Sequence, residues 1–352
     1  QRGAAAALLH TLGAGHTGAA ACCARHLEQS GLGAEAWAVM THAIHDAARC
    51  ARYNEVVSLA TELGDWLDRP EPRPSPTVES VDHRSEAADS ERRGELLRLM
   101  SRAALRCGSS AEARRHLEPE LARRSTVPEV LAERAFLQAE LALLDGELGA
   151  AQRAYEAAQR AYEAIGDAHA LAEALLGRAT ASRMQGEHEA AERQATQAQA
   201  AFASLGDARG LARCARVLGQ VAVLQGRFDD AEGAYGRALA SFAELGDVHG
   251  IADCERGLGG LFLELGRADD ARPHLERAHE AYATMGDFAG EAHCLRGLAR
   301  VRRLRGRSDA ALLDLRRAVE LFQRLGSPLG AADALLDLAS IERELGALDD
   351  AV

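Results

Sequence analysis

A 40-residue repeat dominates the second half of this 352-residue chain. Five consecutive blocks align from position 161 without a gap, and they begin AYEAIGDAHALAEALLGRA, AFASLGDARGLARCARVLG, SFAELGDVHGIADCERGLG, AYATMGDFAGEAHCLRGLA and LFQRLGSPLGAADALLDLA. Two glycine columns run through the blocks: Gly166, Gly206, Gly246, Gly286 and Gly326, and Gly186, Gly226, Gly266, Gly306 and Gly346. A period of this length is typical of proteins whose units pack only on their neighbours, so we expect stacking to replace a single globular core.

Each block predicts two helices joined by tight turns. In one block, Leu205-Gly206-Asp207 ends a helix and begins the next, because glycine favours the left-handed position after a helix and aspartate caps a helix start. We therefore expect helices at about 208–225 and 228–244, with a turn at Gly226-Arg227 between them. Small residues at 212, 219 and 231 allow close approach of the two helices. The space between them is filled by Leu218, Val221, Tyr235 and Leu239.

The spacing of Leu218-Gly219, Gly226, Ala231 and Ala238 resembles the tetratricopeptide signature, in a long 40-residue variety. The resemblance covers about 126–352 and weakens toward the N-terminus. It implies an all-α fold, a right-handed superhelical solenoid of about eight helix-turn-helix units. The chain also resembles the C-terminal tetratricopeptide arm of bacterial multidomain signalling proteins, namely Ser/Thr kinases or ATPase-type regulators.

The rest of the chain divides into further segments. Residues 1–32 are predicted to form an N-terminal helical segment, and 33–68 a first helical pair. Residues 69–88 are predicted to be a disordered linker, because alternate prolines prevent a helix there. Residues 89–352 form the predicted solenoid. Its last repeat is truncated, since the second helix would begin at Asp349, and we expect the final pair to fray or to self-associate.

The composition excludes several classes of function. All 41 basic residues are arginine, so the chain lacks the lysine that P-loop, protein-kinase and pyridoxal sites require. The formal net charge of -12 argues against nucleic-acid and membrane-surface partners. Seven scattered cysteines suit a reduced, cytoplasmic protein. The repeated Cys214, Cys254 and Cys294 are expected to be small buried core residues.

No motif predicts catalysis, a metal or a cofactor. The stretch from Gly13 to Gly18 matches G-x-G-x-x-G, but an alanine-rich helix rather than a strand precedes it. Cys22 and His26 lie one helical turn apart, but no second Cys-x-x-Cys pair completes a closed metal site. We therefore expect no catalytic residues, no metal and no cofactor in this chain.

In tetratricopeptide arrays the first helix of each repeat lines the concave surface, and the resemblance places nine residues there: Arg213, Arg216, Gln220, Asp253, Arg256, His293, Arg296, Arg300 and Arg303. Arg216, Arg256 and Arg296 occupy one column, with one cation per repeat, and Leu176 and Leu336 occupy it in the flanking repeats. Guanidinium groups bind carboxylates through paired hydrogen bonds. The column predicts either a binding surface for an acidic peptide or a merely solvated arginine face.

These features predict a protein–protein interaction scaffold, the recognition or sensing arm of a larger bacterial signalling protein. Its partner would be a protein or acidic peptide in the concave groove. One alternative is a C-terminal fragment of a multidomain Ser/Thr kinase or ATPase-type regulator, with the catalytic domain upstream. Another alternative is a small-molecule sensor domain.

Overall fold

The computed structural model describes residues 94–349 apart from 96, 103 and 106–109. The predicted boundaries at 32, 68 and 88 lie outside these residues, as do the proline-rich linker, the G-x-G-x-x-G stretch and the Cys22–His26 pair. The chain forms two compact units, one of residues 1–106 and 112–123 and one of 107–111 and 124–352. In the first unit, Arg98 Nη1 donates to Glu120 Oε1 at 2.7 Å, and both side chains are largely buried.

The described residues from 110 onward form a succession of helices: α6 (Ser110–Ala122), α7 (Pro128–Leu144), α8 (Leu148–Ile165), α9 (Ala168–Met184), α10 (His188–Leu205), α11 (Ala208–Leu224), α12 (Phe228–Glu244), α13 (Val248–Glu264), α14 (Ala268–Met285), α15 (Phe288–Leu304), α16 (Ser308–Leu325) and α17 (Pro328–Asp349). In the second unit, α7 to α16 form five antiparallel pairs, and α17 follows the last of them. This arrangement confirms the predicted all-α repeat fold.

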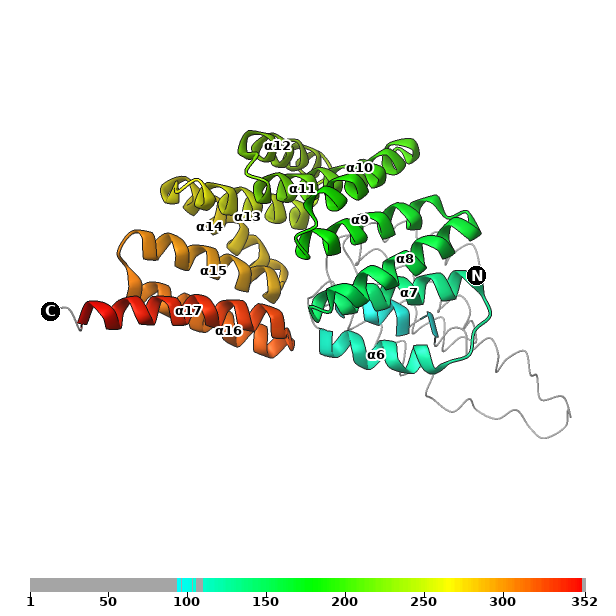
Figure 1. Ribbon diagram of the computed structural model, residues 1–352, viewed down its shortest axis with the longest axis horizontal. Coiled ribbons are helices and arrows are strands. Elements are labelled where there is room, and N and C mark those ends of the chain that lie inside the picture. Colours follow the sequence, from blue (N-terminus) through cyan, green and yellow to red (C-terminus); the bar gives the residue numbers. More distant parts are fainter. Residues whose placement is uncertain (1–93, 96, 103, 106–109, 350–352) are drawn as a thin grey trace, which may run out of the picture. The chain divides into compact units, whose positions relative to one another are not determined.

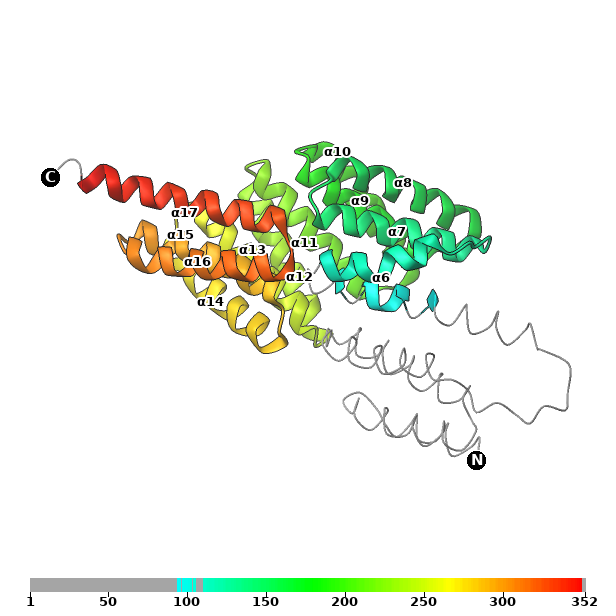
Figure 2. The ribbon, with the colours of Figure 1, turned by 90° about the horizontal axis from the view of Figure 1, so that it is seen from below.

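Successive odd-numbered helices from α7 to α17 contact one another directly. No two even-numbered helices from α8 to α16 pack together to a comparable extent. The odd-numbered helices therefore form one wall of the second unit, which can be followed in Figures 1 and 2. Because they are the more closely spaced layer, they lie on the inner side of the solenoid's curvature.

The Leu-Gly-Asp junctions form as predicted. Gly206 has a φ of 67°, in the left-handed region, and the amide of Asp207 donates to the carbonyl of Phe202 at 3.0 Å. The carboxylate of Asp207 then accepts a hydrogen bond of 3.0 Å from the amide of Gly210. Glycine thus ends α10 and aspartate begins α11. The observed bounds of α11 and α12 agree with the predicted helices to within one residue.

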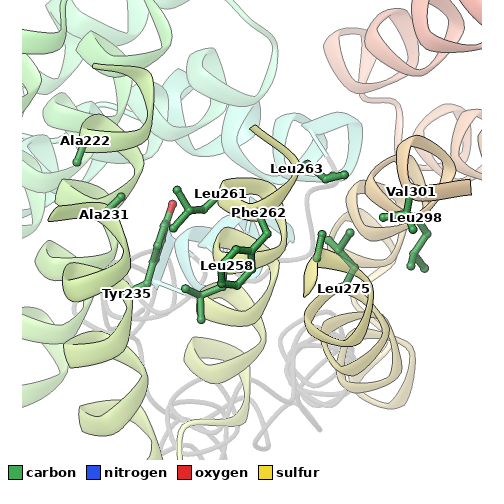
Figure 3. Packing of buried hydrophobic residues seen from close by; sticks show 11 residues of the cluster. Ala222, Ala231, Tyr235, Leu258, Leu261, Phe262, Leu263, Leu275, Leu298 and Val301 are labelled. Carbon is green, nitrogen blue, oxygen red and sulfur yellow. The ribbon is translucent and has the colours of Figure 1, made fainter. Parts of the chain in front are cut away.

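The core between repeats is built from side chains of three to five consecutive helices. Figure 3 shows Tyr235 of α12 beside Leu258 and Phe262 of α13, with Leu275 and Leu298 following from α14 and α15. The predicted filling residues Val221 and Tyr235 are 0% and 2% exposed. Leu218 and Leu239 also pack against the core, although they are only partly buried.

An aromatic ring lies directly on a glycine at four of the junctions between consecutive helix pairs. Phe242, near the end of α12, covers Gly250 in the first turn of α13, where a Cβ atom would lie 2.4 Å from the ring's Cδ1. The same contact recurs at three other junctions, between Phe202 and Gly210, Tyr282 and Gly290, and Phe322 and Gly330. The ring of Phe242 is 1% exposed. The glycine therefore lets the ring fill the corner between consecutive helices.

The last helix departs from the predicted pattern. We expected a turn at Gly346, as in the other members of its column, but α17 continues through Gly346 to Asp349. In the earlier repeats the helix after this glycine packs back on the one before it. Gly346 does not adopt the positive φ of Gly186, Gly226, Gly266 and Gly306 in the same column, so the helical hydrogen bonding continues through it.

The junction contact can be tested with two Gly-to-Ala substitutions. Gly250→Ala should lower the free energy of unfolding by about 1–3 kcal/mol, because the methyl group displaces the Phe242 ring. We expect the lower end of this range, because the fold accommodates a methyl group at the same position of another repeat. There Ala170 lies beside Tyr162, which is still only 6% exposed. Gly236→Ala is the matched control, because a Cβ there meets open space within α12. It should raise stability by about 0.5–1 kcal/mol. Urea unfolding measures both, and equal effects would contradict this account.

Candidate binding surface

The nine predicted site residues lie on three neighbouring helices of the inner wall. Arg213, Arg216 and Gln220 are on α11, Asp253 and Arg256 are on α13, and His293, Arg296, Arg300 and Arg303 are on α15. The structure connects several of them through ion pairs. It also reveals carboxylates that the sequence analysis did not place beside them.

Asp253 is the centre of one such network. Its Oδ1 accepts a hydrogen bond of 2.7 Å from the Tyr282 hydroxyl and lies 3.5 Å from Arg256 Nη2. Its Oδ2 lies 3.5 Å from Arg216 Nε. Burial raises the pKa of Asp253, but the surrounding cations, Arg216 first among them, outweigh burial and hold this pKa well below its usual range. Asp253 is therefore ionised, and it links α11 to α13.

Arg213 is paired in the same way with the preceding repeat. Its guanidinium forms a hydrogen-bonded ion pair with Glu173 of α9. Burial lowers the pKa of Arg213, but Glu173 more than reverses this effect and leaves the pKa above its usual value. Glu173 stands 40 residues before Arg213, in the same repeat column. Reading that column into the flanking repeat would have identified it.

The remaining arginines gather where α15 meets α17. Arg296 Nη1 lies 3.0 Å from Asp333 Oδ2, and its Nε lies 2.9 Å from Asp337 Oδ2. Arg303 pairs with Glu344 of α17 at 3.2 Å. Arg300 pairs instead with Glu264 of α13 at 3.1 Å. A hollow of about 70 Å³ is lined by Arg296, Ala299, Arg300, Arg303, Leu315, Asp337, Ser340 and Ile341.

His293 and Gln220 are placed differently. The exposed His293 ring packs edge-on against Phe322, with ring centroids 5.0 Å apart. Gln220 lies on the wall without forming part of the ion-pair networks described above. The assignment of the nine residues to partner binding remains a prediction.

All six predicted arginines therefore have resident carboxylate partners, but the charge balance varies along the wall. Arg296 faces two aspartates, whereas Arg216 and Arg256 share the single carboxylate of Asp253. Arg213 and Glu173 balance each other. Positive charge is thus in local excess around Arg216 and Arg256.

The sequence analysis missed Arg183, which adds to this excess. Arg183 is in the last turn of α9, and burial together with the nearby charges of Arg216 and Arg256 lowers its pKa to about 10. In the part of the chain that the structure describes, Arg183 has no ion-pair partner. Arg183 stands 120 residues before Arg303, in the same repeat column. Because Arg303 was assigned to the concave surface, the same assignment in the earlier repeat would have identified Arg183.

The cysteine column serves the core, as predicted. Cys214, Cys254 and Cys294 are free thiols that are 0% exposed. Burial raises the pKa of each thiol to about 12. Across residues 94–349, less the six undescribed positions, no group of three His, Cys, Asp or Glu side chains is placed to hold a metal ion. No helix in that stretch is long and apolar enough to cross a membrane.

The Asp253 network predicts a pH-dependent contribution to stability. Because the folded-state pKa of Asp253 is depressed, its contribution is present above the ordinary aspartate pKa of about 3.9 and is lost as the pH falls toward the folded-state value. Asp253→Asn should therefore lower the unfolding free energy at pH 7 by about 1.5–3 kcal/mol. The difference from the parent should shrink between pH 4 and pH 3. Urea unfolding across this range measures it, and a difference independent of pH would rule out the charge as its origin.

Comparison with known proteins supports the fold. A sequence profile described as tetratricopeptide repeat matches residues 250–324. No curated protein matches the chain significantly. Among solved structures, a Rap protein complexed with competence and sporulation factor is similar with a TM-score of 0.64 at 14% identity, covering 89% of this chain and 87% of that one.

Two other solved structures are similar over comparable lengths. NprR in complex with its cognate peptide NprX has a TM-score of 0.59 at 12% identity, covering 88% of this chain and 87% of that one. The apo form of RapI has a TM-score of 0.56 at 13% identity, covering 82% of this chain and 98% of that one. At these identities the likeness concerns the fold. The described chain is thus an all-α solenoid of tetratricopeptide type.

Proposed function

We propose that the inner wall of this solenoid binds an acidic segment of a partner protein. The observation that carries the proposal is the local excess of positive charge, where Arg216 and Arg256 share one carboxylate. A guanidinium group has five N–H donors, so an arginine with a shared carboxylate retains donors for a ligand. The overall charge of -12 makes this local excess more distinctive.

The hollow beside α15 favours a side chain over a whole metabolite. Its volume is about 70 Å³, whereas small-molecule pockets usually span about 300–1,000 Å³. This difference supports peptide binding over the alternative of a small-molecule sensor. Two similar structures point the same way, since NprR is in complex with its cognate peptide and the Rap protein with competence and sporulation factor.

We further propose that the chain is the recognition arm of a larger cytoplasmic signalling protein. The free, buried thiols of Cys214, Cys254 and Cys294 support a reducing compartment. The alternative is that the chain is the C-terminal part of a multidomain Ser/Thr kinase or ATPase-type regulator whose catalytic domain lies upstream. The coding sequence upstream of Gln1 tests this directly, because a kinase or P-loop motif there would identify the catalytic part.

Self-association through α17 is a second proposal. Leu335 is 47% exposed, whereas Leu175, Ala215, Glu255 and Leu295, which occupy the same repeat column, are each 8% exposed. The neighbouring Leu336 is 69% exposed. Ile341, further along the same helix, is only 3% exposed and belongs to a cluster with Ala299, Ala311 and Leu315. The uncovered surface therefore centres on Leu335 and Leu336, and a second copy of the chain would cover it.

The peptide proposal is tested with blocked hexaglutamate as the probe and blocked hexaglutamine as its uncharged control. Calorimetry at low salt should detect binding of hexaglutamate alone, and this binding should weaken as salt screens the charges. Replacing Arg216, Arg256 and Arg296 together by Gln should weaken it at least tenfold, because each charge-assisted contact contributes about 1.5–3 kcal/mol.

The matched control removes three exposed arginines from even-numbered helices, by replacing Arg153, Arg193 and Arg237 with Gln. It makes the same change in net charge and should leave binding within about twofold. Circular dichroism checks that both triple variants fold. Equal binding by the two triple variants would show that the arginine column is only a solvated surface.

The self-association proposal predicts a mass that depends on concentration. Light scattering should show the parent forming dimers as its concentration rises, because burial of exposed leucines stabilises the contact. Replacing Leu335 and Leu336 by Glu should keep the protein monomeric. Replacing the exposed Leu313 of α16 by Glu is the control and should leave the dimer unchanged. A monomeric parent at all concentrations would disprove the contact.

A further inference from the structure

The hydroxyl of Tyr235 lies in the region of the inner wall where arginine side chains outnumber carboxylates. The Tyr235 ring passes between α11 and α13, since a Cβ on Gly219 or on Gly257 would lie 3.2 Å or 2.5 Å from its Cε1. Arg216 lies one turn before Gly219, and Arg256 directly precedes Gly257. Burial raises the pKa of Tyr235 to about 12, against the charges of Arg256, Arg216 and Arg183, which lower it. Arg216 and Arg256 therefore lie on the two helices between which the Tyr235 ring packs, and Arg183 lies on α9, which contacts α11.

In an earlier repeat, the equivalent tyrosine has a carboxylate as its hydrogen-bond partner. Tyr155 occupies the same repeat column as Tyr235, and its hydroxyl donates a hydrogen bond to the carboxylate of Glu140. Two repeats later, Gln220 stands in the column of Glu140. The position equivalent to Glu140 therefore carries no carboxylate that could accept a hydrogen bond from Tyr235. Among the residues that the structure describes, the Tyr235 hydroxyl has no hydrogen-bond partner.

The nearby arginines also have unused donors. The buried Nε atoms of Arg183 and Arg216 both lack a hydrogen-bond partner within the described ranges. Arg216 Nε is 3.5 Å from Asp253 Oδ2, which is an ion pair longer than an ordinary hydrogen bond. Asp253 is already engaged by Tyr282 and Arg256. The three guanidinium groups of Arg183, Arg216 and Arg256 therefore have one resident carboxylate between them.

We propose that Arg183, Arg216 and Tyr235 bind one carboxylate group of the segment held on this wall, in the place that Glu140 occupies beside Tyr155. This proposal rests on the proposed function and specifies where an acidic side chain of the partner is anchored. The carboxylate accepts hydrogen bonds from the Tyr235 hydroxyl and from the two guanidinium groups. Planar guanidinium groups and an oxyanion form short, directional contacts, so the position selects a negative charge over an amide.

Two variants test the site from opposite sides. Arg183→Leu removes the unpaired cation, and the repeat tolerates leucine there because Leu143 and Leu263 occupy the same column. Gln220→Glu supplies the missing carboxylate from within the chain, so it should occupy the site permanently. Gln220→Glu should also raise the melting temperature, because it neutralises an uncompensated cluster of cations. A position that was only structural would not connect higher stability with lost binding.

The measurement is calorimetry with hexaglutamate on the folded 352-residue chain. Arg183→Leu and Gln220→Glu should each weaken binding at least about tenfold, the effect of losing one charge-assisted hydrogen bond. The controls are Arg237→Leu on α12 and Gln323→Glu on α16, both at exposed positions, and they should leave affinity within about twofold. If Arg183→Leu binds as tightly as the parent, the anchor is wrong. The wider proposal of acidic-segment binding then stands on the triple variant alone.

If hexaglutamate does not bind the parent, the acidic-segment proposal is wrong. A second probe then tests whether Arg183, Arg216 and Tyr235 bind an anion at all. Inorganic phosphate should raise the melting temperature of the parent and of both control variants along a saturating curve. The same titration should give no saturating rise in Arg183→Leu and Gln220→Glu. Equal curves in all five proteins would reflect the general stabilising effect of phosphate, and they would overturn the site.

Discussion

The contact between an aromatic ring and a glycine at the junction of consecutive helix pairs is the constraint on which the second unit depends. Phe242 lies so close to Gly250 that a Cβ there would force the ring to shift, and this contact holds the end of α12 against the start of α13. The left-handed Gly246 and the capping Asp247 position the chain for it. Repetition of this corner every 40 residues brings the odd-numbered helices together as one wall.

The close approach of these helices determines the electrostatics of the wall. Residues 40 apart face each other across neighbouring helices, so charges at one repeat position meet charges from the next repeat. Glu173 neutralises Arg213, and Asp253 connects Arg216 to Arg256. The wall is therefore a network of ion pairs in which the positive excess is local.

Differences between the repeats are what give this regular scaffold a specific surface. Some core columns keep one residue type, such as the alanines at 158, 198, 238, 278 and 318, whereas the charged columns of the wall change from block to block. Glu140 becomes Gln220, and the column of Leu143, Val223 and Leu263 holds arginine at positions 183, 303 and 343. Because the junction contacts hold the backbone in place, such substitutions alter charge without altering the arrangement of helices. Leu335 is an exception of another kind, because the same residue type is covered at Leu175 and Leu295 but exposed on α17.

The sequence by itself determined the helix pairs, their bounds and the turns at Gly206 and Gly226, because glycine conformation, helix capping and apolar periodicity act within a few residues. It also placed the arginine column on one helix face. It did not reveal that Asp253 also pairs with Arg216 or that the charge of Arg183 acts on Tyr235, because these interactions join residues of different repeats. Nor did it indicate that α17 would pass through Gly346, since that turn depends on a following helix to pack against. Local propensity therefore fixed the unit, and packing between units decided the surface.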